Sequence, residues 1–408
     1  MENLEKIGNL DIPDYLKNFN FKKKVEEKME NMKKLNVVII GKTGVGKSTL
    51  INAIFGQEVA KVGTGKPITQ HCESYTIGNS PITIYDSKGI ETGEQNLKDL
   101  NEIYDLISRQ NASNNPDLYI HICWYCVSAE GLRIEPNEIS IIKKILDKIP
   151  VILVVTQFTG STDQKEFIAK IRNEFSDNSI DLFPVMALPK ISQSEFGDMN
   201  IQAHGVEKLI ERSYELLPDS VKETFAAYQK VNLQIKIDNA RKASIAYAGA
   251  VAAAAYQPFP IADAPIMIAI QTGMMVHITA SFGINLSSFN FKTVLSGLSG
   301  PFAAAVVGRT LVSLIKLIPG IGTVIGGTIN AATGGVLTFA LANIYIGVLA
   351  SVSRNNGIID GQTIIDELKN AAQNINMDEM KKAWNKNKDS YSKSEAEDIL
   401  NDAKKGLD

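Results

Sequence analysis

A glycine-rich octapeptide carries the strongest chemical signal in the sequence. Residues 41–48 read Gly-Lys-Thr-Gly-Val-Gly-Lys-Ser and stand between an apolar run and a helical pattern. Glycines here let backbone N–H groups turn toward phosphate oxygens, and the N-terminus of the next helix adds positive potential. Lys47 would place its ammonium on the β- and γ-phosphates, and Ser48 would offer a hydroxyl to Mg²⁺. The predicted phosphate site consists of Lys42, Thr43, Gly44, Val45, Gly46, Lys47, Ser48 and Thr49.

An acidic motif at residues 86–89, Asp-Ser-Lys-Gly, closes a later apolar run. A carboxylate at a strand end can hold Mg²⁺ directly or through water, and Gly89 lets its amide swing toward a γ-phosphate. Thr64 and Thr69 lie upstream, and we favour Thr69 as the metal-sensing hydroxyl because it directly precedes a strand-like run. The expected metal ligands are Ser48, Thr69 and Asp86. The residues expected to act on the transferred phosphoryl group are Lys47, Thr69 and Gly89.

These motifs need a sheet whose strands end at one edge. Runs of strand length alternate with helical patterns, which is typical of βα units in a parallel sheet; the runs are 35–40, 81–86, 117–128 and 150–156. Residues 71–77 should pair with 81–86 as an antiparallel hairpin, since the connection between them is too short for a crossover. We predict an α/β P-loop domain with a mixed, mostly parallel sheet at 35–217.

The composition excludes several classes of protein. The chain has 408 residues, of which 44% are hydrophobic and 21% charged, values typical of a folded chain with two or three domains. A net charge of −3 provides no field to hold a polyanion, so nucleic acid is not expected as a partner. Cys123 and Cys126 lie in a strand that sends residues three apart to opposite faces, which disfavours a metal site. Because no signal peptide is evident, we expect a cytoplasmic protein.

Charge is almost absent from residues 243–353. These 111 residues carry only Asp263, Lys292, Arg309 and Lys316, whereas the whole-chain frequency predicts about 23. The uncharged segment 317–353 is long enough for a membrane hairpin, yet its small residues also suit close-packed helices in a soluble bundle. Peripheral or conditional membrane association, a soluble bundle and a spanning form therefore all stay open.

The apolar region completes the predicted organisation of the chain. We predict an amphipathic helical segment at 1–34, which packs on the domain after it or lies on a membrane surface. The α/β domain at 35–217 comes next. An all-α apolar domain at 218–356 and a polar helical tail at 357–408 come after it.

With these motifs in place, the sequence resembles GTPases of the translation-factor class, and in particular the Era-like and immunity-related GTPases. Residues 41–48 resemble the first GTPase motif, Thr69 the switch-I threonine and residues 86–89 the third motif. Ile90 comes next, where Ras-like proteins carry the glutamine that orients water, so the chain resembles the Era-like group, which has a hydrophobic residue there. The apolar region resembles the membrane-associated domain of unknown function fused to Era-like GTPases in bacteria.

The resemblance places base recognition after the fifth strand, where these families carry Asn-Lys-x-Asp. The matching residues are Thr156-Gln157-Phe158-Thr159, and a neutral threonine cannot replace the charge-assisted pair of an aspartate with guanine. Asp163 lies four residues on and could reach back, and the amide of Ala187 could bind the base oxygen. We expect Thr156, Gln157 and Ala187 to contact the nucleotide. Guanine is the favoured base, with ATP an open alternative.

The motifs and the resemblance together imply a GTPase with slow intrinsic hydrolysis of GTP to GDP and phosphate, with Mg²⁺ as cofactor. Its nucleotide state would control the apolar helical domain. Expected partners are a membrane lipid or membrane protein, and a second copy in a nucleotide-dependent homodimer. The alternative is a nucleotide-binding effector or pore-forming scaffold with negligible hydrolysis, which the missing glutamine and aspartate favour.

Overall fold

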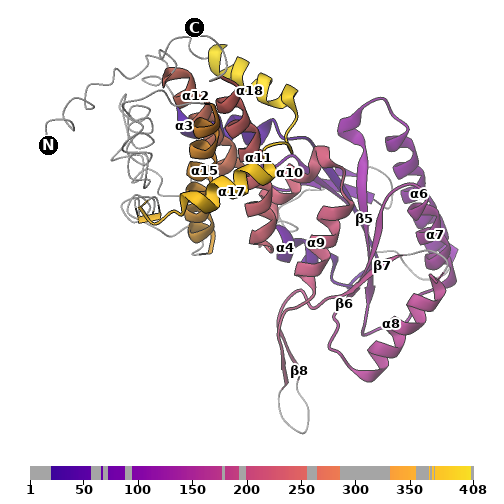
Figure 1. Cartoon of the computed structure of the whole chain (residues 1–408). Coiled ribbons are helices and arrows are strands. Elements are labelled where there is room, and N and C mark those ends of the chain that lie inside the picture. Colours follow the sequence, from indigo (N-terminus) through magenta and orange to yellow (C-terminus); the bar gives the residue numbers. More distant parts are fainter. Residues whose placement is uncertain are drawn as a thin grey trace, which may run out of the picture. The chain divides into compact units, whose positions relative to one another are not determined.

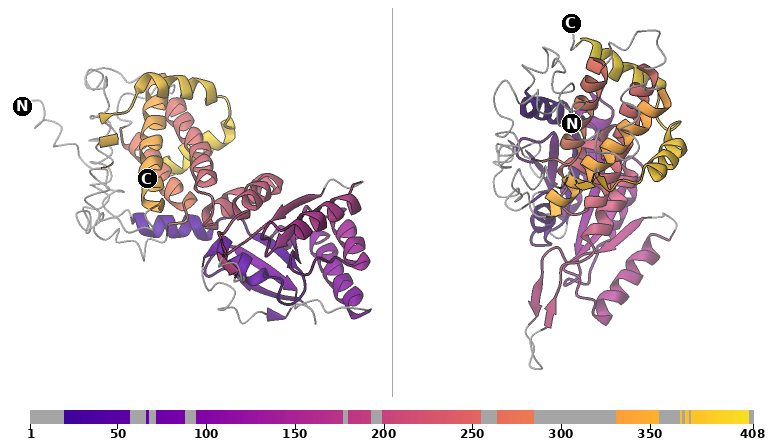
Figure 2. Two further views of the ribbon diagram at one scale, coloured as in Figure 1. Left: turned by 90° about the horizontal axis from the view of Figure 1, so that it is seen from below. Right: turned by 60° about the vertical axis from the view of Figure 1, so that its left-hand side comes forward.

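The structure, a computed structural model, describes most of the sequence in two compact units. One unit comprises Glu30–Ile235; the other comprises residues up to Met29 and from Lys236 on. We call them the sheet unit and the helical unit (Figures 1 and 2). The described residues are 20–56, 66–67, 72–87, 94–176, 180–192, 199–254, 264–284, 331–354, 367, 370–371 and 373–405.

A seven-stranded sheet forms the centre of the sheet unit, with strand order β2-β3-β4-β1-β5-β6-β7. The strands are β1 Leu35–Ile40, β2 Lys66–Pro67, β3 Cys72–Thr76, β4 Ile82–Ser87, β5 Ile120–Ser128, β6 Val151–Thr156 and β7 Asp181–Pro184. From β4 to β7 the neighbours are parallel, whereas β3 is antiparallel to both β4 and β2. The predicted mixed, mostly parallel sheet and its β3–β4 hairpin are confirmed.

Helices cover both faces of this sheet, which explains why β1 and β6 are buried along their whole length and consist largely of valine, isoleucine and leucine. One face carries α4 (Lys47–Phe55), α9 (Val206–Leu216) and α10 (Asp219–Tyr228). The other carries α6 (Glu94–Asn111), α7 (Pro136–Leu146) and α8 (Thr162–Glu174). Cys126 packs in the first hydrophobic cluster and Cys123 in the second, so the two thiols lie on opposite faces as predicted.

Three details of the sheet unit differ from the sequence analysis. The strand expected from 117 begins at Ile120, because Pro116–Leu118 forms a short 3₁₀ helix, η1, capped by the side chain of Asn115. The helix α10 belongs to the sheet unit, although the apolar region was expected to begin at 218; Phe225 lies in the core of the sheet unit. An additional hairpin, β8 (Lys190–Ser192) and β9 (Met199–Ile201), projects from the unit (Figures 1 and 2).

The helical unit is all-α in its described part, as predicted for the apolar region. Its helices are α3 Phe21–Glu30, which reaches one residue into the sheet unit, α11 Leu233–Ala254, which begins there, α12 Ala264–Ser281, α15 Ala331–Arg354, α17 Met377–Asn387 and α18 Lys393–Lys405. In α3, Phe21 and Val25 are buried and lysine–glutamate pairs occupy the exposed side, which matches the expected amphipathic helix.

Glycines and aromatic rings hold the C-terminal helices of this unit on the apolar ones. A Cβ on Gly249 would lie 2.2 Å from the Tyr391 ring, and a Cβ on Gly335 would lie 3.0 Å from Trp384. Trp384 also packs against Phe339, with ring centroids 6.0 Å apart. The segment expected as a polar tail therefore covers apolar helices: α17 packs on α15, and α18 packs on α12.

Polar side chains link α12 to α15 inside the helical unit. The Gln271 amide donates to the Thr338 hydroxyl at 3.2 Å, and the hydroxyls of Thr279 and Tyr345 lie 2.7 Å apart. Within the described residues, one helix segment, Gly334–Arg354 in α15, is long and apolar enough to cross a membrane, and 83% of its most apolar stretch is buried. A core helix of a soluble protein meets the same criterion.

Candidate phosphate-binding site

The glycine-rich loop joins the end of β1 to the start of α4, in the setting that its sequence predicts. Its backbone adopts positive φ at Gly44 and Gly46, with values of 80° and 95°, a region open to glycine at little cost. At Gly41 a Cβ would lie 2.5 Å from the carbonyl oxygen of Cys126 in β5. Glycine is therefore required at Gly41 by close packing against the neighbouring strand and at Gly46 by the turn into the helix.

Lys47 and Asp86 face each other at this edge of the sheet. The Lys47 ammonium donates to the carbonyl of Gly41 at 2.8 Å and lies 3.9 Å from Asp86 Oδ1. Asp86 stands beside Ile39 in the parallel β1–β4 pair. Burial raises the pKa of the Asp86 carboxyl to about 6; the Lys47 ammonium opposes that shift and Glu73 adds to it. Lys47 is only 8% exposed, so its cation is held in place for an anion.

The residues present suit a magnesium ion. Oδ1 of Asp86 is buried and accepts no hydrogen bond from the part of the chain that the structure describes, and Ser48 is exposed on the first turn of α4. Carboxylate and hydroxyl oxygens are hard donors of the kind that Mg²⁺ prefers alongside phosphate oxygens. Among the described residues there is no cluster of three or more acidic, histidine or cysteine side chains able to hold a metal without a nucleotide.

Two of the predicted site residues contact the loop backbone. The buried Thr156 hydroxyl lies 2.5 Å from the carbonyl of Val45, and the Gln157 amide donates to the carbonyl of Gly44 at 3.3 Å. The Ser128 hydroxyl donates to the side-chain oxygen, Oε1, of Gln157 at 2.6 Å. These contacts tie the ends of β5 and β6 to the phosphate loop. Thr156 and Gln157, predicted as nucleotide contacts, here support the loop that would hold the phosphates.

The segment after β6 is organised by Gln164, a residue the sequence analysis did not select. Its buried side-chain oxygen accepts from the Thr159 amide at 2.8 Å, the Thr159 hydroxyl at 3.0 Å and the Gly160 amide at 3.2 Å. Asp163 is exposed on the first turn of α8, and Ala187 is half-buried just after β7. In the sequence, Gln164 is recognisable only as a polar residue in the first turn of a helix capped by Ser161. That position does not indicate that three donors converge on its side-chain oxygen.

The Lys42 side chain points to α7, while its backbone stays in the phosphate loop. Its ammonium donates to Glu135 at 3.0 Å and lies 3.1 Å from Glu138. Burial lowers the pKa of Lys42, but these two carboxylates outweigh it and raise the pKa overall. Of the remaining predicted residues, Thr43 is exposed in the loop, Val45 packs in the core, and Thr49 is half-buried on α4. Thr64, Thr69 and Gly89 lie outside the described residues.

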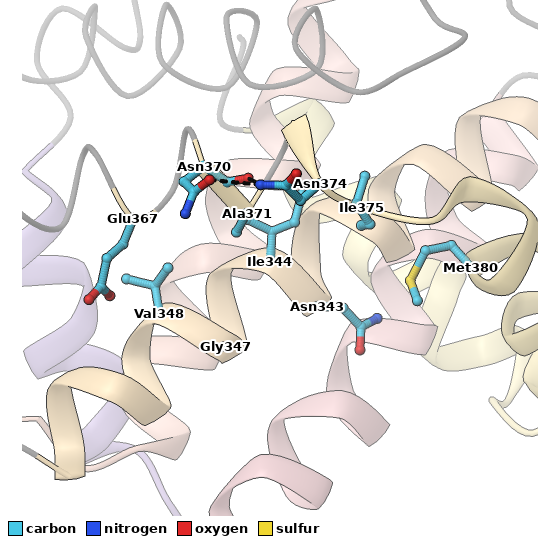
Figure 3. A pocket seen from close by; sticks show the side chains of 10 residues that line it. All are labelled: Asn343, Ile344, Gly347, Val348, Glu367, Asn370, Ala371, Asn374, Ile375 and Met380. Carbon is cyan, nitrogen blue, oxygen red and sulfur yellow. Dashed lines mark hydrogen bonds between the residues drawn. The ribbon is translucent and has the colours of Figure 1, made fainter.

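A separate cavity of about 460 Å³ lies in the helical unit between α15 and the segment that precedes α17 (Figure 3). Glu367 is the only charged side chain among its ten lining residues, and Asn370 and Asn374 are hydrogen-bonded to each other beside it. Such a lining lacks the cations and converging N–H groups that a phosphate needs. The nucleotide site is therefore assigned to the sheet unit.

Residues 36–157 match the family of 50S ribosome-binding GTPases. The match covers β1, the phosphate loop, the acidic motif and the strands through β6, and the strand order and loop geometry agree with it. This region is therefore a P-loop GTPase domain.

Septins are among the curated proteins similar to this chain. Neuronal-specific septin-3 of Rattus norvegicus is 26% identical over 176 residues, which cover 36% of this chain and 49% of that protein. Septin-12 of Homo sapiens is 25% identical over 178 residues, covering 37% and 49%. The chain thus spans about half the length of these relatives. The crystal structure of a probable GTP-binding protein engB is 21% identical, covers 44% of this chain and 97% of that one, and gives a TM-score of 0.31.

Proposed function

We propose that the sheet unit binds GTP and hydrolyses it slowly to GDP and phosphate. The observation that carries this proposal is the phosphate loop with the buried Lys47 ammonium held 2.8 Å from Gly41 O and 3.9 Å from Asp86. A fixed cation and a curl of backbone N–H groups stabilise the charge that builds on phosphate oxygens during phosphoryl transfer. Phosphate released from GTP by the purified protein, measured at steady state, tests the activity.

Ser48, Asp86 and Thr69 are the residues proposed to hold Mg²⁺, which when bound neutralises charge on the β- and γ-phosphate oxygens. Gly89 is proposed to offer its amide to the γ-phosphate. Lys47 is proposed to bind the same oxygens, and the Gly41 carbonyl holds its ammonium in place. Since Ile90 comes directly after Gly89, the attacking water must be oriented by another group.

Guanine is the proposed base. Thr156 and Gln157 use their side chains on the loop backbone, which leaves the Ala187 amide and the Gln164-organised segment as the groups proposed to meet the base. Without an aspartate at the Thr159 position, discrimination against ATP is expected to be weak. Asp163, exposed on the first turn of α8, is the acidic residue proposed for that contact.

The nucleotide state is proposed to control the helical unit, which would associate with membranes conditionally and peripherally from the cytoplasm. The apolar character of α15 supports this idea, as does the covering of α12 and α15 by α17 and α18. A membrane lipid or membrane protein, or a second copy in a nucleotide-dependent homodimer, is the proposed partner. Kinship with bacterial Era-like GTPases and their associated apolar domain is part of the same proposal.

Liposome flotation tests the coupling. Protein with GDP should stay in the soluble fraction, and a non-hydrolysable GTP analogue should increase flotation. A ligand shifts such an equilibrium only by its differential affinity for the two states, so the increase must vanish in Lys47→Ala and persist in Lys222→Met, which removes a cation from an exposed pair. Equal flotation under all conditions would show that membrane binding is independent of nucleotide.

A nucleotide-binding effector or pore-forming scaffold with negligible hydrolysis is the second candidate. Ile90 in place of a water-orienting glutamine favours it. Tight GTP binding without phosphate release above the Lys47→Ala background would select this alternative.

A further inference from the structure

A buried carboxylate in α7 is surrounded by donors from three separate parts of the sheet unit. Glu138 is 3% exposed. Its Oε2 accepts from the Glu135 amide at 2.9 Å and lies 3.1 Å from the Lys42 ammonium, and its Oε1 accepts from the Tyr125 hydroxyl at 3.0 Å. Burial and the neighbouring carboxylate raise the pKa of Tyr125 well above its usual value, so the phenol stays a donor. The carboxylate is thus held in one orientation.

Lys42 carries this arrangement into the phosphate loop. Its ammonium binds both Glu135 and Glu138, and its backbone carbonyl lies 3.4 Å from both the Lys47 ammonium and the Val45 amide. The ion pairs of the Lys42 side chain with α7 therefore fix the position of the Lys42 carbonyl, which in turn helps to orient the Lys47 ammonium. A buried ion pair contributes little net stability but fixes geometry, because breaking it leaves an unpaired buried charge.

We infer that Glu138 is a positioning residue for nucleotide binding, and that it acts through Lys42 to hold the phosphate loop in its binding shape. This inference rests on the proposed nucleotide-binding function. In this inference the backbone of Lys42 forms part of the nucleotide site, whereas its ammonium pairs with Glu135 and Glu138 at the start of α7. The β5 residue Tyr125 and the start of α7 become part of the support of the loop.

The alternative role for Lys42, a direct phosphate ligand, predicts the opposite response at Glu138. If the Lys42 ammonium bound phosphate, neutralising its competitor in Glu138→Gln would release the cation and tighten binding. If Glu138 positions the loop, Glu138→Gln must weaken binding as Lys42→Met does. Lys42→Arg keeps a cation able to pair with two carboxylates and should largely restore affinity.

The experiment measures the affinity of fluorescent GDP and GTP for these variants. Lys42→Met and Glu138→Gln should each lower affinity by about tenfold, and their double variant should lose no more than either single one, because residues of one network are not additive. Tyr125→Phe removes one donor and should cause a smaller loss in the same direction. Arg212→Met, which breaks the ion pair with Asp181 at the start of β7, should leave affinity unchanged.

A measurement on nucleotide-free protein separates this inference from the proposed function. In this ligand-free state, amide hydrogen exchange in the peptide that contains residues 41–47 should be faster in Glu138→Gln and Tyr125→Phe than in wild type. It should be unchanged in Arg212→Met. If the wild-type protein did not bind nucleotide, the proposed function would be refuted. The hydrogen-exchange comparison would still test whether Glu138 stabilises the phosphate loop. Unchanged exchange together with unchanged or tighter nucleotide binding in Glu138→Gln would overturn the inference.

Discussion

The sheet unit and the helical unit bury polar side chains in different patterns. In the sheet unit, the polar side chains of four residues are buried, and each contacts or supports a loop at the carboxyl edge of the sheet; they are Lys47, Thr156, Glu138 and Gln164. In the helical unit, buried polar groups such as Gln271, Thr279 and Thr338 form separate bridges between helices. Convergent polar groups build a site for an anion, whereas dispersed ones hold apolar helices in register.

The packing of the two units differs in the same way. Parallel strands covered on both faces fill the sheet unit with large aliphatic side chains. The clusters of the helical unit combine alanines with aliphatic and aromatic side chains, and Gly249 and Gly335 lie against aromatic rings. Each unit also holds one of the two tryptophans of the chain, Trp124 in β5 and Trp384 in α17. Their fluorescence reports on the two units.

The largest expected effect separates chemistry from folding in the sheet unit. Lys47→Ala should lower affinity for GTP and GDP by at least roughly a hundredfold, since a charge-assisted contact is lost. The unfolding transition of Trp384 should not move. Calorimetric titration measures the affinity, with Lys222→Met as the matched cation control. Retained micromolar affinity in Lys47→Ala would refute the phosphate site.

Substitutions at Gly249 and Gly347 test how closely the helices of the helical unit pack. Gly249→Ala places a Cβ against the Tyr391 ring and should destabilise this unit by about 1–3 kcal/mol. Gly347, also helical, has no atom within 4 Å of its added Cβ, so Gly347→Ala should be neutral or stabilising by about 0.5–1 kcal/mol. Chemical denaturation followed at Trp384 compares them. Equal changes in stability in the two variants would mean that the contact between Gly249 and the Tyr391 ring does not control packing.

Base discrimination is expected to be a smaller effect. GTP should bind more tightly than ATP, but by less than the roughly 1.5–3 kcal/mol that a charge-assisted contact contributes. Parallel titrations of both nucleotides into wild type and Asp163→Ala locate the source. Unchanged discrimination in the variant would exclude Asp163, and a loss confined to GTP would assign the contact to it.

The smallest expected effect is a pH dependence at the opposite end of β1. His121 Nδ1 accepts from the Asn36 amide at 3.1 Å, and burial lowers the pKa of His121 below 6.5. Below pH 6.5 the unfolded chain binds the proton and the folded one does not, so stability should fall as pH drops, by at most about 1.4 kcal/mol per pH unit.

His121→Asn keeps an acceptor but cannot titrate in this range, so it is the matched variant for this pH dependence. Unfolding followed at Trp124 between pH 7.5 and 5.5, a range of about two units around the histidine pKa, should show a flatter profile in the variant. Equal slopes in both proteins would show that His121 does not cause the dependence.

Much of the sheet unit could be predicted because its signals are local. The Gly-x-x-x-x-Gly-Lys-Ser spacing determines a turn and an anion site within eight residues, and continuous apolar runs determine buried strands. The hairpin of β3 and β4 followed from a short connection. In the same way, the period of strand geometry placed Cys123 and Cys126 on opposite faces.

Contacts between residues that are distant in the sequence could not be predicted. Lys42 was predicted as part of the phosphate site, but its sequence position does not reveal that Glu135 and Glu138 bind its ammonium from more than ninety residues away. Residues 357–408 were predicted as a polar helical tail, and only the structure shows that Trp384 and Tyr391 pack on glycine-containing helices of the apolar region.

The sequence by itself determined the phosphate loop, the main strands of the sheet, and the position of the charge-poor region, because each depends on residue type and short-range periodicity. Only the tertiary structure decided which carboxylate binds Lys42, which loop the side chains of Thr156 and Gln157 support, and which helices cover α12 and α15. Those outcomes depend on which distant groups the fold brings within hydrogen-bond or van der Waals distance, and no local pattern encodes that.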